Sequence, residues 1–401
     1  MKFSSRMNSL QDEALLNAFE NIENKDMISF SAGFPSQETY PVEDIKKALA
    51  DVMANNGYDA LSYCSTSGYS DLRKIISKRL KEEFGLGYGI DEIIITNGSQ
   101  QGLDMSAMLF LNRGDIVLCE MPTYMGTVNA LKVYEAQLEP VPLDEDGIDL
   151  DILKEKIKRF RDRIKMIVVC PDNQNPTGIT WSVKRRKDFV RVVSEENFPV
   201  IEDAAYSELT YVEKSLPPLA SFDDKGQIVY LGTLSKVFCP GLRIAWMCAK
   251  KKLISKFLLL KNTMDLSSCT LAQYAAADYL ITKNISTHIN SVKAIYQHRR
   301  DTMLDAIKKE IPDEVQYYTP KGGLYIWLKL PCDMDAVELL KEAKKNGVSF
   351  IPGTSFYPDN RKSNELRLNF SNMDDVSTVK GIRILADTIR GSLIKRRKKY
   401  E

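Results

Sequence analysis

The chain has 401 residues, which is enough for a large core and more than one domain. Its 44% hydrophobic and 27% charged residues are typical of a globular protein, and its net charge of +1 gives no overall attraction to nucleic acid or membranes. No apolar run approaches the roughly 20 residues that span a bilayer, and residues 1–20 lack the apolar segment of a signal peptide. We therefore expect a cytoplasmic protein with neither membrane nor nucleic-acid partners.

Cysteine and histidine usage argues against disulfides and metal sites. The seven cysteines are scattered and form no CxxC pair, which favours reduced thiols. The only two histidines, His288 and His298, lie in polar helical patterns, so we expect both at the surface. A metal centre or a histidine-based catalytic triad is therefore not expected.

The middle of the chain alternates short β-branched runs with longer helical patterns. The predicted strands are Glu92–Thr96, Ile116–Glu120, Gln137–Val141, Met166–Cys170, Val200–Asp203, Ile228–Leu231 and Ile244–Cys248. Helical patterns fill most gaps between them, for example Gln100–Leu111 and Val183–Glu195. This alternation predicts an α/β fold in which a mostly parallel, seven-stranded sheet lies between helices.

The two ends of the chain predict a second, smaller α/β domain. The first 45 residues carry one helix and an extended segment, Met27–Phe30. From about Leu271 a long helical stretch leads to short strands and a last helix. These strands are Gly323–Lys329, Ser349–Pro352 and Glu365–Phe370, and the helix starts near Val376. We predict a large domain at 46–285 and a small domain made from 1–45 and 286–401.

Chemically useful side chains stand at the ends of the predicted strands, where sites form in parallel sheets. Lys236 follows an apolar strand and a short run of Thr and Ser, a setting in which a lysine amine can lose its proton and form a Schiff base. Asp203 ends another strand and can keep a pyridine nitrogen protonated, whereas strand alternation puts Glu202 on the opposite face. An amine and a carboxylate so placed are what pyridoxal phosphate (PLP) requires.

An anion site is predicted at the turn from Thr96 to Gly102. Strand, glycine turn and helix follow one another there, so backbone N–H groups and the helix dipole favour a phosphate. Ser99 and Gln100 would add donors from the turn. Further donors would come from Thr233, Ser235 and Arg243.

Three further positions suit the cofactor ring, and one suits a substrate. Tyr124 can stack on the ring, and Asn175 and Tyr206 can hydrogen-bond its 3′-oxygen. Arg367 alternates within a predicted strand and can bind an α-carboxylate with two parallel hydrogen bonds. Each of these residues alone has an ordinary structural explanation, such as a core aromatic, a helix cap or an exposed strand residue. Their combination is what favours PLP.

The chain resembles the fold-type-I PLP-dependent aminotransferases of class I/II over nearly its full length, and most of all the α-aminoadipate and kynurenine aminotransferase branch. The matching segments are Ser31–Pro35, Leu61–Tyr63, Gly68–Tyr69, Thr96–Gln101, Pro122–Tyr124, Gln174–Gly178, Glu202–Tyr206, Leu234–Lys236, Gly241–Arg243, Pro320–Gly323 and Leu366–Arg367. The order and spacing of these segments make the resemblance specific.

The resemblance implies roles for the same residues and adds two more. Lys236 would carry PLP as an aldimine, Gly33 would contact the substrate with Asn175 and Arg367, and Tyr63 would reach the phosphate of a neighbouring subunit. A homodimer is therefore expected. The N-terminal helix, which often selects the substrate side chain in this branch, matches poorly and leaves the amino donor open.

The expected activity is transfer of the amino group of an L-α-amino acid to a 2-oxo acid, with 2-oxoglutarate as the expected acceptor, by a ping-pong mechanism. Two alternatives stay open at this point. One is a PLP-dependent lyase or decarboxylase on the same fold. The other is the PLP-binding effector domain of a transcription regulator, which we expect less because only about 25 residues precede Met27, too few for a winged-helix DNA-binding domain.

Overall fold

A computed structural model describes residues 1–4, 6–7, 27–211 and 215–400, and for 396–400 the backbone only. The helix predicted within the first 45 residues falls largely on positions 8–26, which lie outside the described residues. The extended segment Met27–Phe30 contains the short strand β1 (Ile28–Ser29).

The larger sheet has eight strands in the order β2-β9-β8-β7-β6-β3-β4-β5. Their bounds are β2 Ile93–Asn97, β3 Ile116–Met121, β4 Gln137–Asp144, β5 Gly147–Ile148, β6 Ile164–Val169, β7 Val200–Asp203, β8 Ile228–Thr233 and β9 Ile244–Cys248. Strands β8, β7, β6, β3 and β4 pair in parallel, whereas β9 is antiparallel to both β2 and β8. The mostly parallel α/β fold is therefore confirmed.

The prediction of seven strands was one short. The additional strand is β5, a two-residue strand that folds back antiparallel on β4 and pairs Gly147 with Asp144. So short a strand has no alternation pattern to detect in the sequence. The predicted bounds of the other strands agree with the structure to within about three residues, and β7 and β9 match at both ends.

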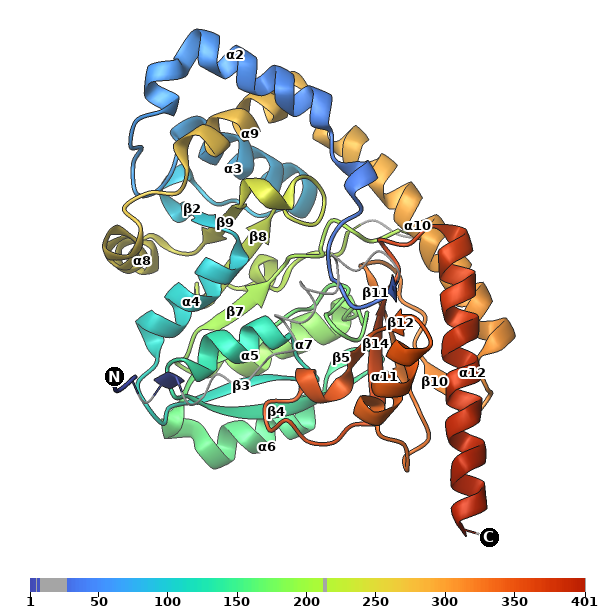
Figure 1. Cartoon of the computed structure of the whole chain (residues 1–401). Helices are drawn as coiled ribbons and strands as arrows, with labels where there is room; N and C mark the ends of the chain where they lie inside the picture. Colours follow the sequence, from blue (N-terminus) through green and yellow to red (C-terminus); the bar gives the residue numbers. More distant parts are fainter. Residues whose placement is uncertain (5, 8–26, 212–214, 401) are drawn as a thin grey trace.

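Helices cover both faces of this sheet (Figure 1). On one face lie α4 (Ser99–Phe110), α5 (Met125–Lys132) and α8 (Lys251–Met264), and on the other lie α3 (Ser70–Phe84), α6 (Leu150–Phe160), α7 (Val183–Ser194) and α9 (Thr270–Thr282). Successive residues of a strand enter opposite cores: Ile94 packs with α4 and α8, while Ile93 and Ile95 pack with α3 and α9. Burial on both faces explains why these strands are continuously apolar.

The C-terminal part forms a smaller sheet in the order β10-β11-β14-β13. Its strands are β10 Gln316–Tyr317, β11 Tyr325–Lys329, β14 Glu365–Asn369 and β13 Ile351–Pro352. Helix α11 (Ala336–Lys345) packs beside this sheet, and the long helices α10 (Ile285–Glu310) and α12 (Asp375–Tyr400) lie side by side (Figure 1). The division into 46–285 and 1–45 with 286–401 stays a prediction.

The predicted strand Ser349–Pro352 is two short strands in the structure. Strand β12 (Val348–Ser349) pairs in parallel with β1, whereas β13 pairs with β14. Through β12, the segment after residue 27 joins the C-terminal part of the chain. Helix α2 (Val42–Ala60) then leads away from this contact and packs on α9.

The histidine prediction was half right. His298 is exposed and contacts Asp375, but His288 is only partly exposed. Its ring packs edge-on against Phe238 and Tyr279, because an amphipathic helix turns this position toward the core. Among the described residues, none of the helices is both long and apolar enough to cross a membrane.

Candidate active site

Strand direction brings the predicted site residues to one edge of the larger sheet. Strands β2, β7 and β8 run the same way, so Asn97, Asp203 and Thr233 end at the same edge. Because β9 runs the opposite way, its beginning lies there, and Arg243 immediately precedes it. A cavity of about 710 Å³ opens at this edge.

All predicted site residues except Tyr63 line this one cavity. They are Gly33, Ser99, Gln100, Tyr124, Asn175, Asp203, Tyr206, Thr233, Ser235, Lys236, Arg243 and Arg367. Tyr63 is not part of the lining; it is 86% exposed, in the loop after α2.

Lys236 and Asp203 share the cavity. Lys236 Nζ donates to Gly33 O at 3.1 Å and lies 5.7 Å from the centre of the Tyr206 ring. Burial raises the pKa of Asp203 to about 6, opposed by the Ala205 N–H and by the positive charge of Lys236. Glu202 lies on the opposite face, where its carboxylate accepts from the backbone N–H groups of Leu219 and Ala220. This is the alternation that the sequence predicted.

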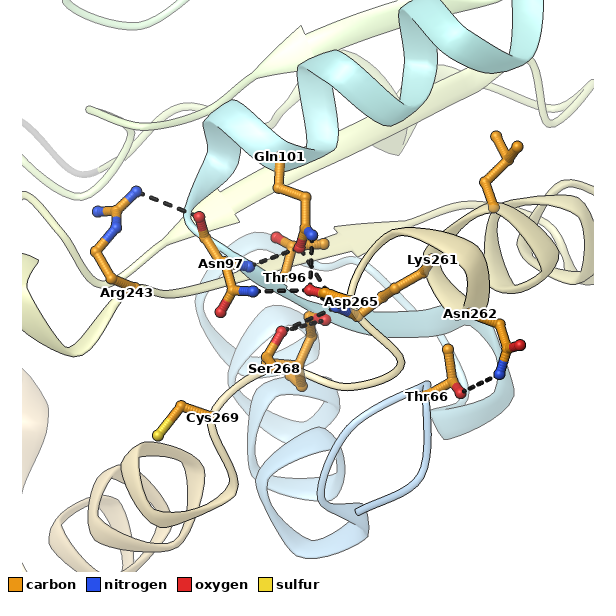
Figure 2. Close-up of polar contacts among 12 residues, drawn as sticks. Thr66, Thr96, Asn97, Gln101, Arg243, Lys261, Asn262, Asp265, Ser268 and Cys269 are labelled. Carbon is orange, nitrogen blue, oxygen red and sulfur yellow. Dashed lines mark hydrogen bonds and ion pairs between the residues drawn. The ribbon is translucent and has the colours of Figure 1, made fainter. Parts of the chain in front are cut away.

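One end of the cavity contains the predicted anion site, called the anion end below, and it is lined by hydroxyls, a guanidinium and the start of α4. Thr233 Oγ1 donates to Ser235 Oγ at 3.0 Å, and Arg243 Nη1 lies 3.5 Å from the same Ser235 Oγ. Arg243 Nη2 donates to Asn97 O at 3.3 Å (Figure 2). Gly98 has a φ of +80°, and a Cβ there would stand 1.9 Å from Arg243 Nη2, so only glycine fits.

Arg367 lies buried in the cavity wall. Its Nη1 donates to Asn175 Oδ1 at 2.9 Å and its Nη2 to Ser31 O at 2.6 Å, while Nε has no partner among the described residues. Its guanidinium carbon lies 4.3 Å from the centre of the Tyr325 ring. Because Asn175 accepts through Oδ1, its amide N–H groups are available as donors.

The sequence analysis missed several residues that line the cavity, among them Tyr325 and Glu120. The Tyr325 hydroxyl lies 3.0 Å from that of Tyr206, and burial raises the pKa of Tyr206 well above its usual value. Glu120, at the end of β3, accepts from Cys170 N at 3.0 Å, and burial raises its pKa to about 8. Tyr325 stands on β11, which pairs with the strand of Arg367. Glu120 is the last residue of a predicted strand, so the argument from strand ends would have found it.

The donor set fits PLP. A cluster of hydroxyls with a guanidinium and a helix start suits a phosphate, a buried carboxylate suits a pyridine nitrogen, and an amine suits the aldehyde. Among the described residues there is no group of three side chains that would hold a metal ion. The fold and this site define a PLP-dependent enzyme of fold type I.

Comparison with known proteins identifies the family. The family model for aminotransferase class I and II matches residues 25–385. An aromatic-amino-acid aminotransferase 1 from Thermococcus litoralis is 34% identical, with 98% of this chain and 95% of that protein covered. A 2-aminoadipate transaminase from Thermus thermophilus is 35% identical, with 92% and 91% covered.

A solved structure agrees with these relatives. Kynurenine aminotransferase from Pyrococcus horikoshii, in complex with PMP, superposes with a TM-score of 0.93 at 36% identity, and 98% of this chain and 97% of that one are covered. The chain belongs to the class I and II aminotransferases and is a PLP-dependent transaminase.

Proposed function

We propose that the protein transfers the amino group of an L-α-amino acid to a 2-oxo acid, with 2-oxoglutarate as acceptor, by a ping-pong mechanism. One observation carries this proposal. The amine of Lys236 and the guanidinium of Arg367 line the same cavity, and both are tied to the segment Ser31–Gly33. A substrate α-carboxylate held by Arg367 would bring its α-carbon within reach of Lys236.

The residues would divide the work as follows. Arg367 and Asn175 bind the α-carboxylate with the Gly33 backbone. The phosphate is held by Ser99, Gln100, Thr233, Ser235 and Arg243. Tyr124 stacks on the ring, Asp203 pairs with its nitrogen, and Tyr206 and Asn175 donate to its 3′-oxygen.

Bound PLP supplies the electron sink that stabilises negative charge at the substrate α-carbon. Lys236 Nζ would take the proton from that carbon and later release it within the same cavity, acting first as base and then as acid. Asp203 must be ionised to pair with the ring nitrogen, and the Lys236 charge favours that form. Thus the chain's own part is positioning and proton transfer.

A homodimer completes the proposal. Tyr63 lies outside its own cavity and is highly exposed, as are the nearby apolar side chains Tyr58 and Leu61. An exposed apolar group of this kind favours a protein interface. We propose that Tyr63 crosses the interface to the phosphate in the neighbouring subunit.

The proposal also includes a cytoplasmic location, which the scattered cysteines and the balanced charge of the chain support.

The test is a titration of the PLP-loaded protein with each common L-amino acid, followed by visible absorbance and without added oxo acid. One group of donors should discharge the PLP band, and 2-oxoglutarate should restore it. Aromatic amino acids, 2-aminoadipate and kynurenine should be tested first, because the similar proteins are named after these substrates. Lys236→Ala should fold but turn over no donor, whereas Lys251→Ala, an exposed control on α8, should behave as wild type.

Two outcomes would contradict the proposal. Steady release of ammonia or CO₂ without an oxo acid would favour a lyase or decarboxylase. Substantial turnover by Lys236→Ala would remove Lys236 from the mechanism.

A further inference from the structure

An ion pair between a fully buried lysine and a partly exposed aspartate lies behind the anion end of the cavity. Lys261, in the last turn of α8, is 0% exposed, and its Nζ lies 2.8 Å from Asp265, the residue that caps the helix. A carboxylate at a helix C-terminus opposes the helix dipole. Burying the Lys261 ammonium also costs desolvation energy that its attraction to a carboxylate often fails to recover. Neither helix propensity nor stability explains this pair well.

The Asp265 carboxylate gathers three donors on one oxygen. Its Oδ2 accepts from Lys261 Nζ at 2.8 Å, and from Asn97 Nδ2 and Gln101 Nε2 at 2.7 Å each (Figure 2). Gln101 also accepts from Asn97 N at 2.9 Å. The residues on either side of the glycine turn at Gly98 are therefore tied to the same carboxylate.

The same turn forms the anion end of the cavity. Asn97 O accepts from Arg243, and Ser99 and Gln100 follow Gly98 directly. Lys261 and Asp265 do not line the cavity, so within the described residues they act on it only through Asn97 and Gln101. Lys261 also donates to Ser268 Oγ at 3.0 Å, so the ammonium has a further hydrogen-bond partner besides Asp265.

We propose that Asp265, neutralised by Lys261, is a positioning residue that holds the turn from Asn97 to Gln101 in the shape that binds the phosphate of PLP. This rests on the proposed function, which puts the phosphate at that turn. Charge-assisted hydrogen bonds are short and directional, so one carboxylate can fix both sides of the turn. The contribution is specific to the phosphate, because Asp203 ends a different strand, β7, and Lys236 lies in the turn after β8.

The test compares two probes, PLP and pyridoxal, which lacks the phosphate. In Asp265→Asn, an amide NH₂ group replaces one carboxylate oxygen, and the side chain loses the charge that attracts the donors of Lys261, Asn97 and Gln101. Binding to the apoprotein is followed by visible absorbance. We expect the affinity for PLP to fall about tenfold, the equivalent of about 1.4 kcal/mol, and the affinity for pyridoxal to change by less than about twofold.

A matched control and a milder variant make the test decisive. Asp91→Asn removes the partner of Lys251 at the other end of α8, in an exposed pair, and should leave both affinities unchanged. Asn97→Ala keeps the ion pair but removes one of its two links to the turn, since Gln101 still donates to Asp265. It should show a smaller but still selective loss of PLP affinity even if Asp265→Asn does not fold.

Equal losses for PLP and pyridoxal, or no loss for either, would overturn the positioning role and leave the pair as a structural contact. If wild-type protein failed to bind PLP through Lys236 at all, the proposed function itself would fail. A normal wild type with non-selective variants would defeat only the inference about Asp265.

Discussion

Tyr325 connects two side chains that the sequence analysis treated separately. Its ring lies against the Arg367 guanidinium, and its hydroxyl meets that of Tyr206. A Cβ on Gly33 would stand 2.3 Å from the same hydroxyl, so Gly33 leaves room for Tyr325. If Tyr206 donates its proton to the cofactor's 3′-oxygen, as proposed, Tyr325 is the donor in the tyrosine pair.

Tyr325→Phe tests whether Tyr325 is the donor in its hydrogen bond with Tyr206. Without the Tyr325 proton, Tyr206 becomes a weaker donor to the 3′-oxygen, which then holds a proton more tightly. The pKa seen in the pH titration of the bound-PLP absorbance should rise, by less than about one unit. A lowered or unchanged pKa would mean that Tyr325 accepts from Tyr206 or does not affect it. Tyr279→Phe, outside the cavity, is the control.

Glu120 predicts a pH dependence of stability. Burial raises its pKa from 4.5 to about 8. Between these values the unfolded chain has lost the proton and the folded protein keeps it, so the free energy of unfolding falls as pH rises, by at most about 1.4 kcal/mol per pH unit. Relative to wild type, apoprotein carrying Glu120→Gln should gain stability from pH 5 to 8. Denaturant unfolding at pH 5, 6.5 and 8 measures this, and parallel curves would contradict it.

At the scale of elements, strand direction explains the composition of the site. Asp203 and Thr233 are the last residues of their strands, whereas Arg243 directly precedes the first residue of β9. The reason is that β9 lies between β2 and β8 and runs antiparallel to both. The glycine turn after β2 then meets Arg243 across the strand edge. A close approach at Gly98 follows from this geometry.

Gly98→Ala should therefore reduce PLP affinity as well as stability. The new methyl group would displace Arg243, and the Gly98 backbone, with φ +80° and ψ 161°, adds a cost of about 1–3 kcal/mol for any other residue. Gly85→Ala is the control: this glycine also has a positive φ, +70°, but lies in the left-handed helical region, and no atom lies within 4 Å of its Cβ position. We expect both variants to lose stability in thermal melts and only Gly98→Ala to lose PLP affinity. Equal PLP affinities would contradict the role of this close approach.

At the scale of the whole molecule, the proposed dimer makes a complementation experiment possible. Lys236→Ala removes the amine from its own site, and Tyr63→Ala removes the phosphate contact from the partner's site. In a mixed dimer, one site loses both residues and the other keeps both. Mixing the two variants under conditions of subunit exchange should restore activity at limiting PLP, as measured by oxo-acid formation. Two variants that never complement would show that Tyr63 serves its own subunit or none.

Most of the larger sheet was predictable from sequence because its strands are buried on both faces and read as apolar runs. Both bounds of β9 were predicted correctly, but its antiparallel direction was not. The direction of a strand depends on how the chain connects it to its neighbours and not on its composition. Strand β5 has only two residues, too few for any periodicity. Glu120 was read as the last residue of a strand, and only packing showed that its carboxyl group is buried.

The sequence by itself determined the family, the cofactor and the residues to examine, because these depend on local patterns: a lysine after a strand, a glycine turn before a helix, an aspartate at a strand end. The tertiary structure decided which of them meet. It placed Arg367 beside Asn175, Tyr325 beside Tyr206, and Lys261 with Asp265 behind the turn at Gly98. Such contacts join residues far apart in the chain, and only the packing of the folded elements brings them together.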